Sequence, residues 1–556
     1  MKRLVWALAG LGAGLTTGCG APPVAPPRTG QVQVQILAFN DFHGHLEPPQ
    51  GSAGKIRVGP DPQKDQVDAG GVEYLATHVL ERLATNPHTA VVAAGDLVGG
   101  SPLLSALFHD EPTIEALDLL GLQIAAVGNH EFDEGFEELL RLQNGGCHPK
   151  DGCADGTPFE GARFRYLAAN VVDGEGNTLL PGHIVRVFDG VRVAFIGLAL
   201  EGVPDVTLAS AVKGLTFLDE IETINGRVKA LKAEGIEAIV VIIHEGAETA
   251  GGFNECVGAS GPLVDIVQGL DPAVDVVVSG HTHQAYNCKI NGKIVTSGAH
   301  AGRILTDIDL TIDRASGEVL AATAENLVVT RTVVPAANLT ALIQRYRAVA
   351  APLANRVVGK VMGDLSKIPN EAGESAMGNV IADAQLAATR AVGAQIAFMN
   401  PGGIRSDLSA GQLSGSEGLG EVTYGEAFTV QPFNNLLVTM TLTGAQIEGL
   451  LEAQWREGKE RILSVSGGFQ YTWDPAKPMG ERVDPTSITF EGKPLDPAAT
   501  YRVTVNSYMA DGGDAFTVLT EGTERVTGGV DVDALEAYLK ANSPLAVPKR
   551  DRIQRR

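Results

Sequence analysis

Short apolar runs alternate with amphipathic stretches from Val32 to about Val333. The runs are rich in β-branched residues and end near Gly, Asp or Asn, which is typical of buried strands. The stretches between them, for example residues 71–85, place apolar side chains at helical spacing. This alternation predicts an α/β domain with helices layered on sheet. The expected strands are "VQVQILAFN", "TAVVAAG", "QIAAVGN", "RVAFIGLAL", "AIVVIIHEG" and "VDVVVSGH".

Residues 303–329 break this rhythm, because apolar and polar positions alternate with period two on both sides of a Ser-Gly turn. This pattern predicts an antiparallel pair that closes a first domain over residues 32–335. The following segment has a helical pattern despite Pro352 and predicts a linker helix over residues 336–357. We expect a second, α+β domain over residues 358–556, whose first helical stretch is "ESAMGNVIADAQLAATRAVGA".

Length and charge narrow the class of protein. A chain of 556 residues is too long for one domain, which agrees with the two domains expected from the pattern. A formal net charge of -23 argues against a polyanion-binding surface, since phosphate backbones are gripped by excess Lys and Arg. We therefore expect no nucleic-acid polymer as partner. One small phosphate ester held at a metal stays compatible with this charge.

The first residues have the composition of an export signal. Lys2 and Arg3 precede the apolar run "LVWALAGLGAGL" and the small-residue stretch "TTGCG", which predicts a signal peptide over residues 1–18. Cys19 stands where bacterial lipoproteins carry their lipid, although Thr16 fits that motif poorly. Residues 19–31 have the composition of an extended tether. We expect an exported lipoprotein at the cell envelope, or otherwise a secreted protein.

The other four cysteines are an even number in an exported chain, which favours disulfides. Cys147 and Cys153 share one polar, Gly-rich loop, so we expect a local bridge and a second bridge between Cys256 and Cys288. A zinc knuckle formed by Cys147, His148 and Cys153 is the alternative, but it lacks a fourth ligand nearby in the sequence.

Five expected strands are each followed by Asp, Asn or His. These residues are Asp41 and His43, then Asp96, then Asn129 and His130, then His244, then His281 and His283. In open α/β sheets, sites form outside the carboxyl ends of the strands, so we expect these side chains to converge. The remaining histidines lack this context and are expected to be structural or solvated; they are His45, His78, His88, His109, His148, His183 and His300.

The side-chain types in this set suit a pair of metal ions. Two Asp, one Asn and four of the five His form a mixed nitrogen and oxygen set, which favours Zn²⁺, Mn²⁺, Co²⁺ or Fe over Ca²⁺ or Mg²⁺. Seven ligands are too many for one tetrahedral ion and are about right for two ions that share a carboxylate. Two such ions clamp the attacking and leaving oxygens of a phosphoryl displacement.

The motifs "DFH", "GD", "GNHE", "HEG" and "GHTH", in this order, resemble those of the calcineurin-like binuclear metallophosphoesterases. This resemblance implies a four-layer α/β/β/α fold for the first domain. It also implies that Asp41, His43 and His283 hold one metal and that Asn129, His244 and His281 hold the other. Asp96 would bridge the two metals. His130 would contact the substrate phosphate and be oriented by Asp133.

The stretches "ILAFNDFHGHLEP" and "GNHEFDEG" are similar to those of the bacterial UDP-sugar hydrolase/5'-nucleotidase family, as is the second half of the chain. The second-half motifs are "ESAMGNVIADA", "NPGGIRSDL", "FTVQPFNNLLV", "SGGFQYTWD" and "YRVTVNSYMADGGDAF". The resemblance implies that this half binds the nucleoside. Phe433 and Tyr508 would sandwich the base, Asn435 would bond to it, and Asp514 would accept from the ribose hydroxyls.

The same resemblance implies that Asn400 and Arg405 contact the phosphate or the base, for which the planar fork of arginine is well suited. One difference from the family concerns a second arginine, which many relatives carry just before the "GN" of "ESAMGN". The nearby positions here are Glu371 and Glu374.

The expected activity is metal-dependent hydrolysis of nucleoside 5'-monophosphates, with nucleotide sugars as further substrates. The alternatives are a 2',3'-cyclic nucleotide phosphodiesterase with 3'-nucleotidase activity and a dinucleotide pyrophosphatase. A sulfur-ester hydrolase would leave the nucleoside motifs unexplained. The alternative from another class is a non-catalytic nucleotide-binding lipoprotein, whose signature would be a degraded metal set.

Overall fold

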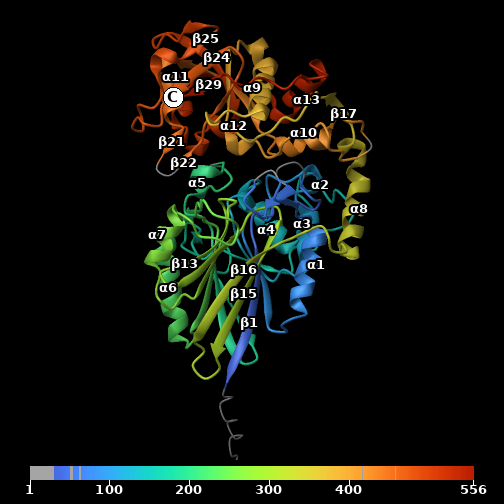
Figure 1. Ribbon diagram of the computed structural model, residues 1–556, viewed down its shortest axis with the longest axis vertical. Helices are drawn as coiled ribbons and strands as arrows, with labels where there is room; N and C mark the ends of the chain where they lie inside the picture. Colours follow the sequence, from blue (N-terminus) through green and yellow to red (C-terminus); the bar gives the residue numbers. More distant parts are fainter. Residues whose placement is uncertain (1–29, 50–53, 62–63, 209, 416, 457–458) are drawn as a thin grey trace, which may run out of the picture.

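The structure is a computed structural model that describes residues 30–556 except 50–53, 62–63, 209, 416 and 457–458. The predicted signal peptide, Cys19 and nearly all of the 19–31 tether lie outside the described residues. The described chain forms two domains stacked along the long axis, with helix α8 running between them at one side (Figure 1). Among the described helices, none combines the length and apolar character needed to cross a membrane.

Two six-stranded sheets form the centre of the first domain. One sheet has the strand order β16-β15-β1-β4-β5-β6 and the other β13-β14-β12-β11-β9-β8. The strands of the first sheet are β1 (Gln31–Phe39), β4 (Thr89–Ala94), β5 (Ile124–Ala126), β6 (Arg165–Leu167), β15 (Ile304–Asp313) and β16 (Val319–Val328). Those of the second are β8 (His183–Phe188), β9 (Val191–Leu198), β11 (Ala238–Ile243), β12 (Val276–Ser279), β13 (Ala285–Ile290) and β14 (Lys293–Gly298).

The two sheets pack face to face, and helices cover their outer faces. Ile36 of β1 packs with Val240 and Val276 of the second sheet in a core between the sheets. The next residue, Leu37, belongs to a second core under the helices, because successive strand side chains point to opposite faces. The covering helices are α1 (Val72–Leu83), α3 (Glu111–Leu120) and α4 (Phe136–Asn144) on one side and α6 (Glu220–Ala233) and α7 (Pro262–Gly269) on the other. The expected four-layer arrangement is confirmed.

Smaller expectations for this domain are also met. β15 and β16 form the antiparallel pair expected over residues 303–329. Cys147 is bonded to Cys153 and Cys256 to Cys288, with Cα–Cα distances of 4.7 and 5.0 Å. The short elements are α2 (Leu103–Ala106), η2 (His130–Phe132), α5 (Val203–Val206), and the strand pairs β2 (Lys55–Arg57) with β3 (Gln66–Asp68) and β7 (Val171–Val172) with β10 (Thr216–Phe217).

Helix α8 (Ala337–Ala354) connects the two domains and contains Pro352 in its last turn. Its first half packs on the first domain through Leu339, Leu342 and Tyr346. At its other end Leu353 packs against a small cluster formed by Leu103 of α2, Phe428 of α10 (Tyr424–Val430) and Val532 of α13 (Asp531–Ala541). Apolar contacts from three parts of the chain therefore meet at this joint, which we call the interdomain cluster.

The second domain is built on a five-stranded sheet of order β23-β18-β27-β20-β28 and a four-stranded sheet of order β26-β25-β24-β29. Helices α9 (Ala376–Thr389) and α13 pack in one core, and α11 (Gly444–Glu452) in another. The strands are β18 (Ile396–Met399), β20 (Leu436–Thr443), β23 (Ser464–Val465), β24 (Phe469–Trp473), β25 (Thr489–Phe490), β26 (Lys493–Pro494), β27 (Thr500–Asn506), β28 (Thr523–Val530) and β29 (Ile553–Arg555). Two further pairs are β17 (Val357–Lys360) with β19 (Glu421–Thr423) and β21 (Trp455–Arg456) with β22 (Lys459–Glu460).

Glu536 of α13 anchors the chain just beyond α8. Its carboxylate accepts from both terminal nitrogens of Arg356, one of them at 2.9 Å, and from Lys540. The Arg356 guanidinium also lies 4.9 Å from the centre of the Tyr424 ring. Hydrogen bonds from Arg356, together with Lys540, lower the pKa of Glu536 to about 2 although burial opposes the shift. This ion pair therefore holds the end of the linker onto the second domain.

We expect Glu536→Gln to lower the free energy of unfolding by about 1 kcal/mol at pH 7, since a bidentate, partly buried pair is lost. A pKa depressed from 4.5 to about 2 stabilises the fold above pH 4.5, and this stabilisation is lost as the pH falls toward 2. Urea unfolding of the natural protein and the variant, at pH 7 and at pH 3, measures the loss in the free energy of unfolding at each pH. Glu81→Gln, at an exposed position of α1, is the control. An equal loss at both pH values would contradict the assignment.

Candidate active site

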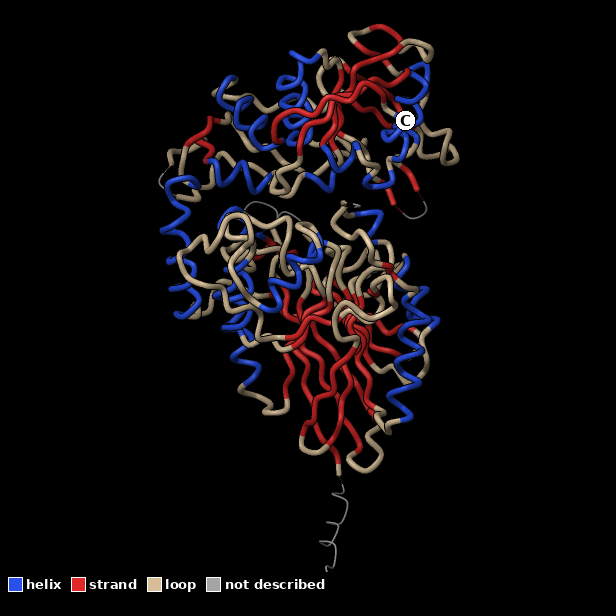
Figure 2. Tube along the Cα trace, turned by 180° about the vertical axis from the view of Figure 1, so that it is seen from behind, coloured by secondary structure: helices blue, strands red, loops and turns tan. Residues whose placement is uncertain are grey.

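The carboxyl ends of strands from both sheets meet at the edge that faces the second domain. Figure 2 shows the strands of the first domain ending in a layer of loops on this side. β1, β4 and β5 of one sheet lead to Asp41, Asp96 and Asn129, while β11 and β12 of the other lead to His244 and His281. The site is therefore assembled across the two packed sheets, and not along the edge of one.

The backbone at these strand ends is held in conformations that residues other than glycine rarely adopt. Asp41, His43, Asp96, His281 and His283 all have positive φ, between 47° and 68°. Such residues cost free energy and persist only where their surroundings determine them, which is common at functional sites.

Steric crowding explains why the residues before Asp96 and Asn129, in "GD" and "GN", are glycines. A Cβ at Gly128 would lie 2.2 Å from Oδ1 of Asp96, and a Cβ at Gly95 would lie 2.7 Å from the backbone nitrogen of Gly128. The two loops approach each other too closely for any side chain at these positions. The glycines therefore allow Asp96 and Asn129 to reach the same point.

Hydrogen-bond acceptors face one another where these loops meet. Nδ1 of His244 lies 2.7 Å from the carbonyl of Ala94 and must donate to it. The other ring nitrogen, Nε2, lies 3.1 Å from Oδ1 of Asn129 and 3.1 Å from Oδ2 of Asp96. A neutral imidazole presents a lone pair there, so three acceptors converge. This arrangement fits a bound cation, and the backbone carbonyl fixes the ring in the orientation and tautomer that a metal ligand needs.

His43 repeats the same arrangement. Its Nδ1 lies 2.9 Å from the carbonyl of Gly99, which turns Nε2 toward Nε2 of His283 at 3.1 Å. The latter nitrogen lies 3.5 Å from Oδ1 of Asp41. Burial lowers the pKa of His43 and of His283 well below the usual value, and Arg405 adds to the shift at His43. Both rings are therefore neutral, as metal ligation requires.

The donor atoms form two neighbouring groups. Asp41, His43 and His283 form the first group, and Asp96, His244 and His281 form the second. Oδ1 of Asn129 joins the second group at 3.0 Å from Nδ1 of His281. Asp96 also lies 3.7 Å from His43, so its carboxylate stands between the groups. The structure brings all seven predicted ligands together, and the donor set fits two transition-metal ions with Asp96 between them.

The protein groups alone respond to this concentration of negative charge by binding a proton. Burial lowers the pKa of His244, but the adjacent Asp96 outweighs it and the pKa rises to about 10. A buried site that attracts a proton this strongly is a site where a cation is favoured.

His130 occupies the first turn after β5 and points beside this cluster. Its Nδ1 lies 2.8 Å from Oδ2 of Asp133, and its backbone nitrogen donates to Oδ1 of Asp96 at 2.9 Å. Burial lowers the pKa of His130, but Asp133 and Asp96 together outweigh burial and leave the pKa raised. The ring is thus oriented by Asp133 and favours its charged form. His130 also stands with His43 and Asp96 in a third group of potential ligands.

Glu131 has a structural role that was not predicted from the sequence. Its buried carboxylate accepts from the backbone nitrogens of Asp96 at 2.9 Å, Leu97 at 2.7 Å and Gly128 at 2.6 Å. Burial and the nearby Asp96 raise the pKa of Glu131 to about 7, and His244 and the backbone donors of Leu97 and Gly128 oppose that shift. One side chain therefore ties the loop that carries Asp96 to the loop that carries Asn129.

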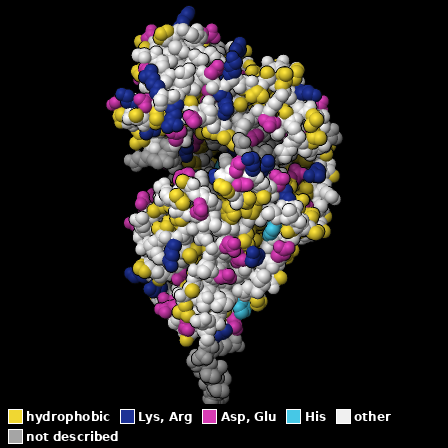
Figure 3. Space-filling model, viewed as in Figure 1, with side chains coloured by type: hydrophobic (Ala, Val, Ile, Leu, Met, Phe, Trp, Pro, Cys, Tyr) yellow, Lys and Arg dark blue, Asp and Glu magenta, His cyan; other side chains and the backbone are white. Residues whose placement is uncertain are grey.

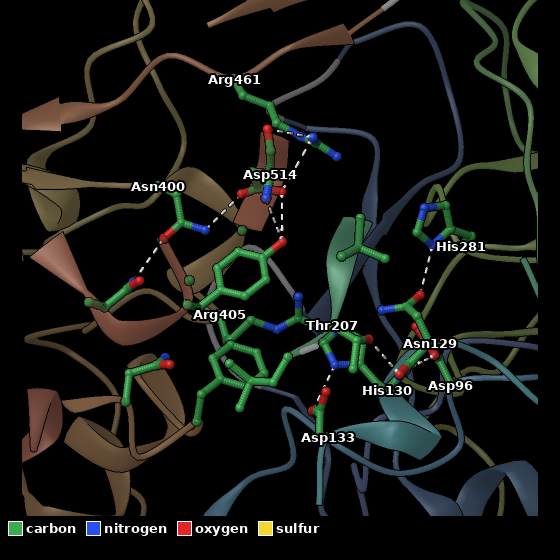
Figure 4. Close-up of a pocket in the computed structure, with 18 of the residues that line it drawn as sticks. Asp96, Asn129, His130, Asp133, Thr207, His281, Asn400, Arg405, Arg461 and Asp514 are labelled. Carbon is green, nitrogen blue, oxygen red and sulfur yellow. Dashed lines mark hydrogen bonds and ion pairs between the residues drawn. The ribbon is translucent and has the colours of Figure 1, made fainter. Parts of the chain in front are cut away.

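A cavity of about 250 Å³ extends from this cluster to the second domain. The space-filling view shows the surface hollowed between the two domains (Figure 3). All six residues predicted to bind substrate line the cavity, namely Asn400, Arg405, Phe433, Asn435, Tyr508 and Asp514. In the close-up, Asn400, Asp514 and Arg461 lie on one side, His130, Asn129 and His281 on the other, and Arg405 between them (Figure 4).

Two of these residues reach the first domain. Nη2 of Arg405 lies 3.2 Å from Nε2 of His43, and its guanidinium carbon lies 5.6 Å from the centre of the Phe433 ring. The Phe433 ring stacks on that of His130, with centres 5.6 Å apart and planes 15° apart. Arg405 therefore lies at the end of the cavity next to the candidate metal ligands.

Asn400 lies at the far end of the cavity. Its Nδ2 donates to Oδ2 of Asp514 at 2.8 Å, and its Oδ1 accepts from Asn506 at 3.0 Å. The hydroxyl of Tyr508 lies 3.2 Å from Oδ1 of Asp514. These contacts group Asn400 with the residues expected around the ribose.

Arg461 and Asn506 also line the cavity, although neither was predicted from the sequence. Nη1 of Arg461 lies 3.3 Å from Oδ1 of Asp514, so a second arginine is present in the second domain's part of the site. Glu374, one of the two glutamates near the expected arginine position, is fully buried and accepts from Asn379 and from the backbone of Arg552. It supports the C-terminal strand and does not line the cavity.

We expect Glu131→Gln to reduce both bound metal and kcat by about 10- to 100-fold, as is usual when a residue that positions metal ligands is changed. The NH₂ group of the new glutamine would face backbone N–H groups that are also donors. This repulsion would separate the loops that carry Asp96 and Asn129. Metal analysis and the rate on a chromogenic phosphate monoester measure the two effects. Glu137→Gln, at an exposed position of α4, should change neither. Normal metal content in the Glu131 variant would refute this role.

Comparison with known proteins places the chain in a family. The calcineurin-like phosphoesterase family matches residues 34–285, and the family of the 5'-nucleotidase C-terminal domain matches residues 357–521. Endonuclease YhcR of Bacillus subtilis is 32% identical over 94% of this chain, which spans only 41% of that protein. Cell wall protein Lmo0130 of Listeria monocytogenes is also 32% identical, over 95% of this chain and 70% of that protein.

Among solved structures, a 5'-nucleotidase precursor from Thermus thermophilus matches with a TM-score of 0.76 and 28% identity. The match covers 94% of this chain and 99% of that structure, so both domains and their order are shared. The resemblance inferred from the motifs is confirmed. The chain belongs to the calcineurin-like phosphoesterases that carry a 5'-nucleotidase C-terminal domain.

Proposed function

We propose that this protein is an exported, metal-dependent phosphohydrolase that releases phosphate from nucleoside 5'-monophosphates. The observation that carries the proposal is a single cavity that is lined both by candidate metal ligands and by the six predicted substrate contacts. A ligand in this cavity has its phosphate end at His130 and Arg405 and its nucleoside end at Tyr508 and Asp514. That order matches a nucleotide whose 5'-phosphate is cleaved.

The first domain supplies the chemistry. The seven ligands would hold two divalent cations, which when bound would supply an acidified water and positive charge for the phosphate oxygens. His130, whose charged form Asp133 favours, adds a hydrogen bond to the same oxygens as negative charge develops on them. Arg405 approaches from the second domain and contributes a second donor to the phosphate.

The second domain supplies the substrate preference. Phe433 and Tyr508 offer faces for a base, and stacking of this kind is worth about 1–3 kcal/mol for any base. Asn435 donates to or accepts from the base, and Asp514 accepts from the ribose hydroxyls. These contacts give a preference for nucleoside phosphates over other phosphate esters. Asp514 is oriented for this by Asn400, Tyr508 and Arg461.

The names of relatives support parts of the proposal. The Thermus protein is called a 5'-nucleotidase precursor and the Listeria relative a cell wall protein, which favours export. Export, the 1–18 signal peptide and the lipid on Cys19 stay predictions. YhcR is called an endonuclease, but this chain spans under half of it, so cleavage of phosphodiesters is a test outcome and not the proposal.

A substrate panel with His130→Asn as the matched variant tests the proposal. Phosphate release is measured with added Mn²⁺, Zn²⁺ or Co²⁺ from AMP, UDP-glucose, 2',3'-cyclic AMP, 3'-AMP, NAD and bis(p-nitrophenyl) phosphate. We expect AMP to have the highest kcat/KM. The His130 variant should lose about 100- to 1,000-fold in kcat with metal content unchanged, because a transition-state donor is removed.

Turnover of none of these compounds would refute the phosphohydrolase proposal. A preference for the cyclic nucleotide, NAD or the diester would replace the 5'-monophosphate by one of the alternative substrates. Full activity of the His130 variant would refute the role of that residue.

We expect Arg461→Met to raise KM for AMP by roughly 5- to 30-fold, which corresponds to the loss of one charged hydrogen bond that orients Asp514. The rate on p-nitrophenyl phosphate, which has no ribose, should change by less than twofold. Arg461→Lys keeps the charge and should recover part of the affinity. Equal losses on both substrates would show that Arg461 acts on the phosphate, and not through Asp514.

A further inference from the structure

A second cluster of histidines and carboxylates lies on the first domain, outside the cavity of the active site. His109 follows α2, Glu134 follows η2, and His148 and Asp151 belong to the loop that the Cys147–Cys153 bridge closes. None of these four residues lines the active-site cavity. The sequence pattern left both histidines without a role, and it left the zinc knuckle at His148 without enough ligands. The structure supplies those ligands from distant parts of the chain.

Three ligand atoms converge on one point. Nε2 of His109 lies 2.9 Å from Oδ2 of Asp151, and Nδ1 of His148 lies 3.2 Å from the same oxygen. One donor atom from each of the three residues lies within 4.8 Å of the other two. Ligands about 2.0–2.2 Å from a tetrahedral ion are separated from each other by roughly 3.3–3.5 Å. The two observed spacings to Asp151, 2.9 and 3.2 Å, are slightly shorter than those values, so the ligands would move apart a little to hold an ion.

The surroundings of the cluster resemble those of a metal ligand. Nδ1 of His109 lies 2.8 Å from Oε2 of Glu134, which directs Nε2 toward Asp151 and His148. A zinc-bound imidazole usually has such a carboxylate behind it, on the ring nitrogen that faces away from the metal. The loop is held in place by the disulfide and by two backbone hydrogen bonds between His148 and Gly152. The backbone of this loop is therefore held in place, while the two histidine rings must still turn to share one ion.

The two histidine rings stack with centres 3.6 Å apart and planes 16° apart. Their side chains are only 18% and 11% exposed, whereas that of Asp151 is 60% exposed, so water has access to the fourth ligand position. A cation would need the rings to tilt, because it must lie near the plane of each one.

We propose that His109, His148 and Asp151 bind a third divalent metal ion, with Glu134 orienting His109. Two imidazoles and one carboxylate favour zinc among the available divalent ions. The site joins the disulfide loop to the turn before α3, and Glu134 adds the turn after η2. It is a structural site, separate from the two-ion cluster.

The position of this site connects it to the supports of the active site. Asp110, next to His109, accepts from the backbone nitrogen of Gly99 at 3.0 Å, and the carbonyl of Gly99 holds the ring of His43. Glu134 directly follows Asp133, which orients His130. The proposed ion therefore fixes the outer side of two loops whose inner sides serve the active site.

Zinc content of the full chain tests this proposal without depending on catalysis. Protein is equilibrated with buffered Zn²⁺ and freed of excess metal, and zinc is counted per chain by mass spectrometry. We expect three ions for the natural protein and two for the His109→Ala/His148→Ala variant. His88→Ala, a histidine outside both clusters, should keep three.

A matched pair at Asp151 distinguishes a metal site from an ion pair. Asp151→Asn and Asp151→His both remove the carboxylate that pairs with His109, but only the second restores a strong zinc ligand. Because Asp151 is exposed, neither change should prevent folding. We expect two ions in the Asn variant and three in the His variant. Equal zinc content in both variants, or two ions in the natural protein, would overturn the proposal.

Discussion

The structure of the first domain depends on one electrostatic constraint. Hydrogen-bond acceptors of the candidate metal ligands face one another at close range. Backbone carbonyls take the Nδ1 protons of His43 and His244, so in the neutral rings the opposite nitrogens present lone pairs to Asp96, Asn129 and His283. Such a cluster is unfavourable unless a cation occupies it. The positive φ angles at five ligands and the two glycines without room for a side chain are consequences of bringing these atoms together.

That constraint also explains why two sheets are needed. Strand ends within a single sheet lie in a row, whereas the ligands must surround two ions. With β1, β4 and β5 on one side and β11 and β12 on the other, donors approach from opposite directions. The core between the sheets, which includes Ile36 and Val240, sets the separation of the two rows. Packing far from the site therefore determines the geometry at the site.

Much of this arrangement could be predicted because it is encoded locally. A buried strand followed by Asp, Asn or His is visible in the sequence, and so is the order of the strand ends. The β5 segment shows the limit, because the strand expected over "QIAAVGN" has only the three residues Ile124–Ala126. Gly128 is instead bound by Glu131, and that contact is created by folding. Arg461 was missed for the same reason, since only the folded chain places it beside Asp514.

The division between the domains bears on how substrate preference is controlled. The residues proposed to act on the phosphate come from the first domain, apart from Arg405, while those proposed to contact the ribose come from the second. Arg405 and Phe433 each contact the ring of a first-domain histidine, so the complete site exists only when the domains are in the observed relation. The interdomain cluster and the Arg356–Glu536 pair hold that relation at the opposite end of α8 from its anchor in the first domain. Changes at this joint should therefore alter how well a nucleotide spans the two domains, while the ligand cluster itself, built within the first domain, stays intact.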